Sequence, residues 1–161
     1  MASDRERLLG TYLNDHMAGS MVGVELARRA RAQNEGTPLG RFLTEIVKEI
    51  EEDRDTLKQI MDRVGVGQDK KKQAFGWAGE KIGRLKPNNR LFGYSPLSRV
   101  IELEGLSLGI EGKRCLWQAL RVTKEPRLAE FDFEALIERA ARQRSGVEEH
   151  RLAAAQTAFG G

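Results

Sequence analysis

Two residues that could do chemistry stand where helical spacing expects apolar side chains. In the stretch YLNDHMAGSMVG, steps of three and four residues fall on Leu9, Leu13, His16, Ser20, Gly23 and Ala27. A second such row falls on Ile46, Ile50, Asp53, Leu57, Ile60 and Val64. An imidazole and a carboxylate in apolar rows can form a buried polar pair, ligate a metal or transfer a proton.

The positions of His16 and Asp53 favour a direct pair. If their two segments form an antiparallel hairpin that turns near residues 34 and 35, both lie about 18 positions from the turn and at the same height. A lone carboxylate in a core costs several kcal/mol, and a hydrogen bond to an imidazole would satisfy both groups. We therefore predict a buried His16–Asp53 pair in which the carboxylate raises the pKa of His16.

A second, weaker polar pair is predicted between Glu104 and His150. With a turn near residue 128, His150 lies within one helical turn of the level of Glu104. A lengthwise crossover between the hairpins would separate this pair from the first by on the order of 20 Å. We therefore expect two structural pairs, with no metal and no cofactor, and keep an atypical metal site as the alternative.

Four long helices are expected to position these residues, over 4–34, 38–64, 96–124 and 132–158. The start signals are Ser3 with Glu6, Thr37-Pro38, Ser95-Pro96 and Asp132, and the stop signals are Gly36, Gly65, Pro126 and Gly160. Each helix would be about 40 Å long, and no strand-like alternation is present. The fold class is therefore all-α, a four-helix bundle in a single domain over 1–161.

The connections between the helices predict how they pair. Short loops join the first helix to the second and the third to the fourth, which predicts two antiparallel hairpins. The connection between the hairpins is about 30 residues long and makes a long crossover. Within it, residues 69–85 carry an Asp69 cap and an apolar seam, which predicts a fifth, shorter helix.

This layout of two long hairpins and a crossover resembles the ferritin-like superfamily. The resemblance covers the architecture of most of the chain and implies a two-iron centre, built from a Glu on each of two helices and a Glu-x-x-His on each of the others. Here Leu13 stands three residues before His16, and Val147 stands three before His150. Because the ligand motif is absent, we expect neither a two-iron centre nor its oxidase chemistry.

The third helix carries glycines at Gly105, Gly109 and Gly112. Glycine inside a helix costs up to about 1 kcal/mol relative to alanine, so the repetition predicts a close helix crossing. The crossing can lie inside the bundle or at a subunit interface. A homo-oligomer formed through this helix is therefore one predicted mode of association.

A basic segment over residues 63–99 holds nine Lys or Arg against Asp69 and Glu80, a net charge of +7. Its candidates for anion binding are Lys70, Lys71, Lys72, Arg84, Lys86 and Arg90. Aromatic residues are interleaved with them, as on surfaces that bind nucleic acid or an anionic membrane. The alternative is that the aromatics cover the bundle while the cations face water.

Several function classes lack their signals. The chain has no phosphate-binding glycine loop, no zinc-ligand spacing and no Ser or Cys nucleophile with a histidine base. The lone Cys115 is expected to be a small buried apolar residue. The start MASDRERLLG is not a signal peptide, and no apolar run could span a bilayer, so we expect a soluble cytoplasmic protein. Arginine outnumbers lysine two to one, which indicates a GC-rich bacterial genome.

Together these patterns predict a non-catalytic, ferritin-like helical bundle that acts by self-association or partner binding. The alternatives are an atypical metal-binding or redox protein of the same layout and a binder of anionic polymer or membrane through residues 63–99.

Overall fold

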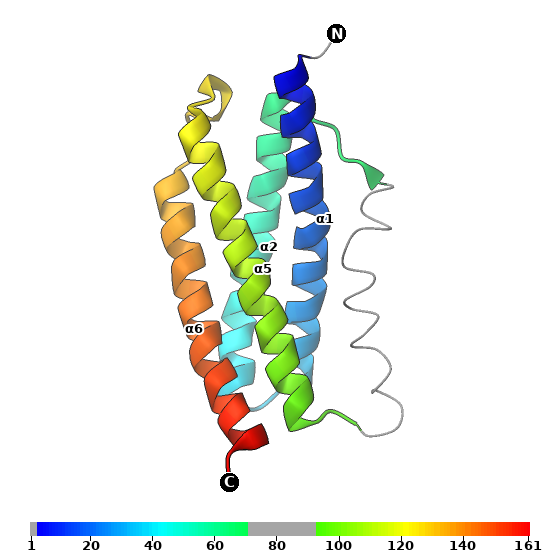
Figure 1. Ribbon diagram of the computed structural model, residues 1–161, viewed down its shortest axis with the longest axis vertical. Coiled ribbons are helices and arrows are strands. Elements are labelled where there is room, and N and C mark those ends of the chain that lie inside the picture. Colours follow the sequence, from blue (N-terminus) through cyan, green and yellow to red (C-terminus); the bar gives the residue numbers. More distant parts are fainter. Residues whose placement is uncertain (1–2, 71–92) are drawn as a thin grey trace.

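A computed structural model describes residues 3–70 and 93–161. These residues form four long helices and no strand: α1 Asp4–Gln33, α2 Pro38–Val64, α5 Pro96–Thr123 and α6 Phe133–Phe159 (Figure 1). The all-α, four-helix prediction is confirmed, and no helix end differs by more than one residue from its predicted position. Between α5 and α6 lies only the short 3-10 helix η2, Pro126–Leu128. The fifth helix predicted over 69–85 lies, beyond its first two residues, outside the described residues.

The helix ends follow from local capping chemistry. At the start of α1, Ser3 N–H donates to Glu6 Oε2 at 2.7 Å, and Glu6 N–H donates to Ser3 Oγ at 3.2 Å. Side chains at the other three starts accept in the same way from backbone N–H groups: Thr37 from Gly40, Ser95 from Ser98 and Asp132 from Ala135. Helix α2 ends at Gly65, whose φ of +73° suits glycine.

Side-chain bonds between the helix ends show how the helices lie against each other. Near the start of α1, Asn14 Nδ2 donates to Gly67 O at 3.0 Å, just beyond the end of α2. At the other end of α1, Asn34 Nδ2 donates to the Tyr94 hydroxyl at 2.9 Å, and Arg99 Nε donates to Asn34 Oδ1 at 2.9 Å. Helix α1 thus packs against both α2 and α5, and α5 packs against α6 (Figure 1).

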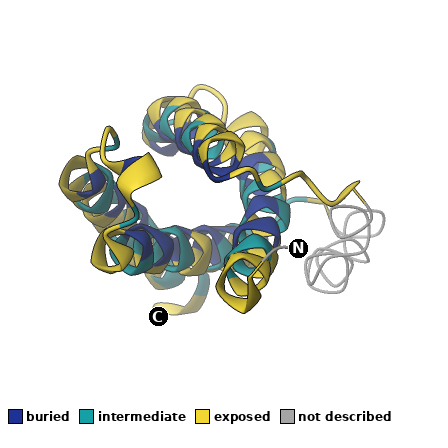
Figure 2. Ribbon diagram, turned by 90° about the horizontal axis from the view of Figure 1, so that it is seen from above, coloured by how far each residue is buried: buried dark blue, intermediate teal, exposed yellow. Residues whose placement is uncertain are grey.

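Buried residues face the interior of the bundle and form two apolar clusters (Figure 2). The first cluster includes Leu43, Leu103 and Val147, and the second includes Met61 and Trp117. Along α2 the first ends at Ile50 and the second begins at Leu57, so Asp53 lies between them. None of the described helices is long and apolar enough to cross a membrane.

The lone cysteine does not belong to the core. Cys115 is exposed on α5, so the prediction of a buried residue is wrong. Its Sγ lies 3.9 Å from Glu111 Oε1, one turn earlier on the same helix. The apolar positions of this part of α5 are instead taken by the adjacent Leu116 and Trp117.

Gly40, in the first turn of α2, is required by a close approach of the loop before it. A Cβ on this residue would lie 2.0 Å from the carbonyl oxygen of Asn34. That oxygen already accepts from Thr37 N–H and from Thr37 Oγ1, so it is held in place. We predict that Gly40→Ala lowers the free energy of unfolding by about 1–3 kcal/mol, measured by urea denaturation.

Gly19→Ala is the matched control, because a Cβ at Gly19 meets no described atom within 4 Å. It should raise the free energy of unfolding by up to about 1 kcal/mol through helix propensity. Equal stability of the wild type and Gly40→Ala would contradict the close approach.

Candidate functional site

The buried carboxylate of Asp53 is satisfied by residues from α5 and α6. Its side chain is 2% exposed. Lys113 Nζ donates to Asp53 Oδ2 at 2.5 Å, and Gln143 Nε2 donates to the same oxygen at 3.3 Å. Arg139 Nη2 donates to Asp53 Oδ1. No hydrogen bond joins His16 to Asp53 in the described residues, so the predicted pair is not formed.

The network continues beyond Asp53 to the surface of α2. Gln143 Oε1 accepts from Lys113 Nζ at 2.6 Å, and Gln143 Nε2 donates to Glu49 Oε2 at 2.8 Å. Arg139 Nη1 donates to Glu52 Oε2 at 3.1 Å. The buried charges are thus paired and hydrogen-bonded, which is the condition for keeping them in a core.

Lys113 and Gln143 also stand in apolar rows of the sequence, but on helices far along the chain from Asp53. Gln143 interrupts the apolar row of α6, and Lys113 stands three residues after Ile110 in the apolar row of α5. Two cations neutralise a buried carboxylate more strongly than a neutral imidazole does, and their long side chains reach across the bundle. Burial lowers the pKa of Lys113, and the neighbouring Asp53 carboxylate opposes that shift.

His16 is half-buried and packs against Tyr12, with ring centroids 4.6 Å apart in an edge-on arrangement. Its imidazole makes no hydrogen bond within the described chain. Burial lowers the pKa of His16, and the nearby Asp15 opposes this. The predicted rise in pKa is therefore wrong, because the carboxylate that was to cause it is engaged by Lys113 and Arg139.

The second predicted pair is also not formed among the described residues. Glu104 is exposed, and His150 packs against Phe42, with ring centroids 4.6 Å apart. The buried acid of this part of α5 is instead Glu102, which is 0% exposed and pairs with Arg29 at 3.0 Å. Burial raises the pKa of Glu102, against the opposing effects of the Tyr94 hydroxyl and of Arg29.

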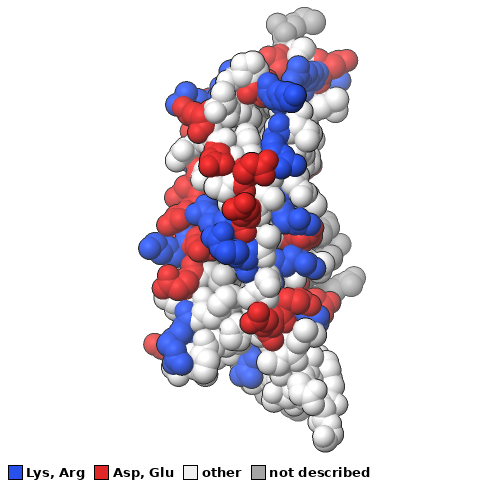
Figure 3. Space-filling model, turned by 90° about the vertical axis from the view of Figure 1, so that its left-hand side faces the viewer, with Lys and Arg blue, Asp and Glu red and all other residues white. Residues whose placement is uncertain are grey.

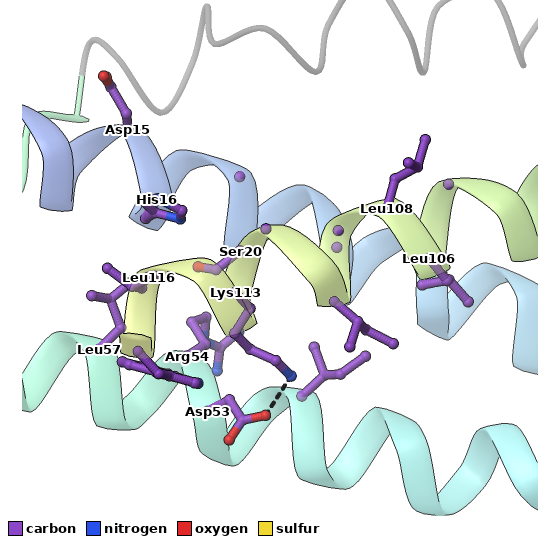
Figure 4. A pocket seen from close by; sticks show the side chains of 18 of the residues that line it. Asp15, His16, Ser20, Asp53, Arg54, Leu57, Leu106, Leu108, Lys113 and Leu116 are labelled. Atoms are coloured by element: carbon purple, nitrogen blue, oxygen red, sulfur yellow. Dashed lines mark hydrogen bonds and ion pairs between the residues drawn. The ribbon is translucent and has the colours of Figure 1, made fainter. Parts of the chain in front are cut away.

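A cavity of about 410 Å³ lies between α1, α2 and α5 (Figure 4). Its lining is mostly apolar and includes five glycines from two helices: Gly19 and Gly23 of α1 and Gly105, Gly109 and Gly112 of α5. Asp53 of α2 and its ion-pair partner Lys113 of α5 both line it. His16, in the apolar row of α1, is part of its wall.

The glycines keep this space open. A Cβ built on Gly19, Gly23, Gly109 or Gly112 would meet no described atom within 4 Å. Only Gly105 is closely approached, with Leu26 Cδ2 at 3.0 Å from the added atom. The close helix crossing predicted from the glycines of α5 therefore occurs at Gly105 and not at Gly109 or Gly112, where the described neighbours stand too far away. A second copy of the chain on this helix stays a prediction.

Most of the predicted anion-binding residues, Lys71, Lys72, Arg84, Lys86 and Arg90, lie outside the described residues. Lys70 is described and exposed. On the face drawn in Figure 3, cationic and anionic side chains are interspersed over the helices. Residues 3–70 and 93–161 contain no cluster of three or more His, Cys, Asp or Glu side chains placed so that they could hold a metal ion.

Removing the Asp53 carboxylate should be costly, because Lys113 and Arg139 both lose it as a partner. Lys113 then keeps only the neutral Gln143, and Arg139 keeps only Glu52. We predict that Asp53→Ala lowers the free energy of unfolding by about 3–5 kcal/mol, measured by urea denaturation. His16→Ala should cost only about 1 kcal/mol, and the two changes together should be additive to within about 0.5 kcal/mol. A large coupling between positions 16 and 53 would contradict this arrangement.

The titration of His16 gives a second check. An NMR titration should place its pKa below the usual value of about 6.5. The unfolded chain then binds a proton at His16 more readily than the native state does. The contribution of neutral His16 to the free energy of unfolding is therefore fully present above the pKa that this residue has in the unfolded chain. It falls as the pH drops towards the native pKa. A value above that of an unfolded peptide would contradict the described surroundings of this residue.

In comparisons with known proteins, no protein-family model, no curated protein and no solved structure matches the chain.

Proposed function

We propose that this chain is a non-catalytic helical bundle of ferritin-like layout, with two antiparallel hairpins joined by a crossover, that binds a small, mainly apolar molecule. The binding site is the cavity between α1, α2 and α5. The observation that carries the proposal is this half-open, mainly apolar cavity, lined by glycines from two facing helices.

The size and lining of the cavity support small-molecule binding. Its volume of about 410 Å³ falls in the range of roughly 300–1,000 Å³ that is common for ligand sites. Such sites combine an apolar wall with a few convergent polar groups. Here the polar groups include His16 and Ser20 of α1 and Lys113 of α5.

The composition of the wall points the same way. Each glycine inside a helix lowers stability by up to about 1 kcal/mol relative to alanine. At Gly19, Gly23, Gly109 and Gly112 an alanine would meet no described neighbour, so close packing does not account for the missing side chains. What these glycines supply is volume on the facing sides of α1 and α5.

The pairing of the ionisable groups supports binding in preference to catalysis. Asp53 and Lys113 hold each other in place, and Arg54 Nη2 donates to Asp55 Oδ1 at 3.2 Å. General acid–base chemistry needs a group that is free to take or give a proton beside the reacting atoms. His16 is the candidate for such a group, and no described nucleophile or carboxylate is hydrogen-bonded to it.

Filling the cavity should weaken ligand binding while the chain stays folded. We predict that the neutral fluorescent probe N-phenylnaphthylamine binds the wild type, and that Gly109→Leu weakens binding at least about tenfold by occupying the space. Gly109→Ala should raise the free energy of unfolding by up to about 1 kcal/mol, since the added Cβ meets no described atom. Fluorescence titration and urea denaturation measure the two effects.

Ala141→Leu, at an exposed site on α6 away from the cavity, is the matched control and should bind the probe as the wild type does. Probe binding that survives Gly109→Leu would place the ligand elsewhere. A loss of stability in Gly109→Ala, or a dimer that Gly109→Leu dissociates, would instead assign the glycines to helix packing or to a second copy.

A further inference from the structure

The distribution of polar groups along the cavity identifies the class of molecule that fits it. We infer that the ligand is elongated, with an apolar tail and an uncharged polar head such as a hydroxyl, and that His16 and Ser20 bind the head. This inference rests on the proposed function, since it concerns the same cavity.

The cavity is long and has two different ends. Its α1 wall runs from Tyr12 to Gly23, about 16 Å by helical rise. Leu26 lies beside Gly105, so the Gly23 end of the α1 wall faces the start of the α5 wall. In Figure 4, His16, Ser20, Arg54 and Lys113 lie towards one end, together with Leu57 and Leu116, and Leu106 and Leu108 lie at the other.

The apolar end can hold only an apolar part of a ligand. Besides Leu106 and Leu108 it is lined by Ile50 and Ile110 and by the backbone of Gly23, Gly105 and Gly109. The described side chains at this end offer no hydrogen-bonding group to a ligand. A polar group placed here would lose its water without compensation, whereas a hydrocarbon chain gains from burial.

At the other end the charges of Asp53, Lys113 and Arg54 are already compensated, and the Asp15 side chain points away from the cavity (Figure 4). Asp53 is neutralised by Lys113 and Arg139, and Arg54 is paired with Asp55. A charged head would therefore be desolvated without a counter-ion of its own. The polar end suits a head that is polar but uncharged.

His16 and Ser20 can make the hydrogen bonds that such a head needs. They are four residues apart on α1, which puts both side chains on the same face of the helix (Figure 4). Ser20 Oγ donates to Met17 O at 2.7 Å and keeps its own oxygen free to accept. A neutral imidazole carries one donor and one acceptor, and burial, which lowers the pKa of His16, favours that form. A hydroxyl can thus donate to Ser20 Oγ and accept from the imidazole N–H of His16.

The test is a displacement titration at neutral pH, in which the fluorescence of bound N-phenylnaphthylamine is followed. It is made on the variant Trp77→Phe, in which Trp117 is the single tryptophan. Decanol, decanoate and decylamine share one chain length and differ in head charge. We expect decanol to displace the probe at a concentration at least about tenfold lower than either ion. His16→Phe and Ser20→Ala should each weaken decanol about two- to tenfold, since the head loses a hydrogen bond, whereas Ala141→Leu, away from the cavity, should leave decanol binding unchanged.

The outcomes distinguish a failure of the inferred head group from a failure of the proposed small-molecule binding. Tighter binding of decanoate would overturn the uncharged head and assign Lys113 or Arg54 to an anion. Tighter binding of decylamine would overturn the uncharged head and assign a carboxylate of the cavity wall to a cationic head. Probe binding without displacement by decanol overturns this inference and leaves the proposed function standing. No probe binding to the wild type refutes both.

Discussion

The burial of one carboxylate is the constraint on which the rest of this structure depends. Asp53 is almost fully removed from water, and two cations and an amide reach it from two other helices. Breaking such a buried arrangement by removing one partner is strongly unfavourable. Because Lys113 lies on α5 and Arg139 and Gln143 lie on α6, the network fixes the positions of three helices along the bundle axis. A shift of one helical turn, about 5.4 Å, would separate the charges.

The middle of the bundle is therefore not an ordinary apolar core. Apolar clusters fill the space on either side of Asp53, and between them the interior holds the charge network and the cavity. Asp53 and Lys113 belong to both, since they line the cavity and carry the network. The hydrogen-bonded ion pair forms part of the cavity wall, and the glycines of α1 and α5 leave space beside it. Stability and open space are thus supplied at the same level by different residues.

The helices could be predicted from the sequence because their ends depend on local chemistry. Ser3, Thr37, Ser95 and Asp132 each cap a helix through a bond to a residue three positions on. Both unusual residues, His16 and Asp53, were also found from the apolar rows that they interrupt. Their partners could not be found in this way, since Lys113 and Arg139 lie 60 and 86 residues from Asp53, and long cationic side chains are normally counted as surface. The glycines of α5 could not be interpreted from the sequence either, because a glycine can allow a close helix contact or leave a space unfilled.

The sequence distance between Asp53 and its partners also has a consequence for how the chain acquires its fold. Helices α1 and α2 are made first, and no cation of their described residues pairs with Asp53. Its partners Lys113, Arg139 and Gln143 follow 60, 86 and 90 residues later. We therefore expect α1 and α2 to leave Asp53 hydrated during synthesis, so that they do not bury this part of their interior early. We expect the N-terminal half to remain loosely packed until α5 and α6 arrive, and the two halves to consolidate in a single late event.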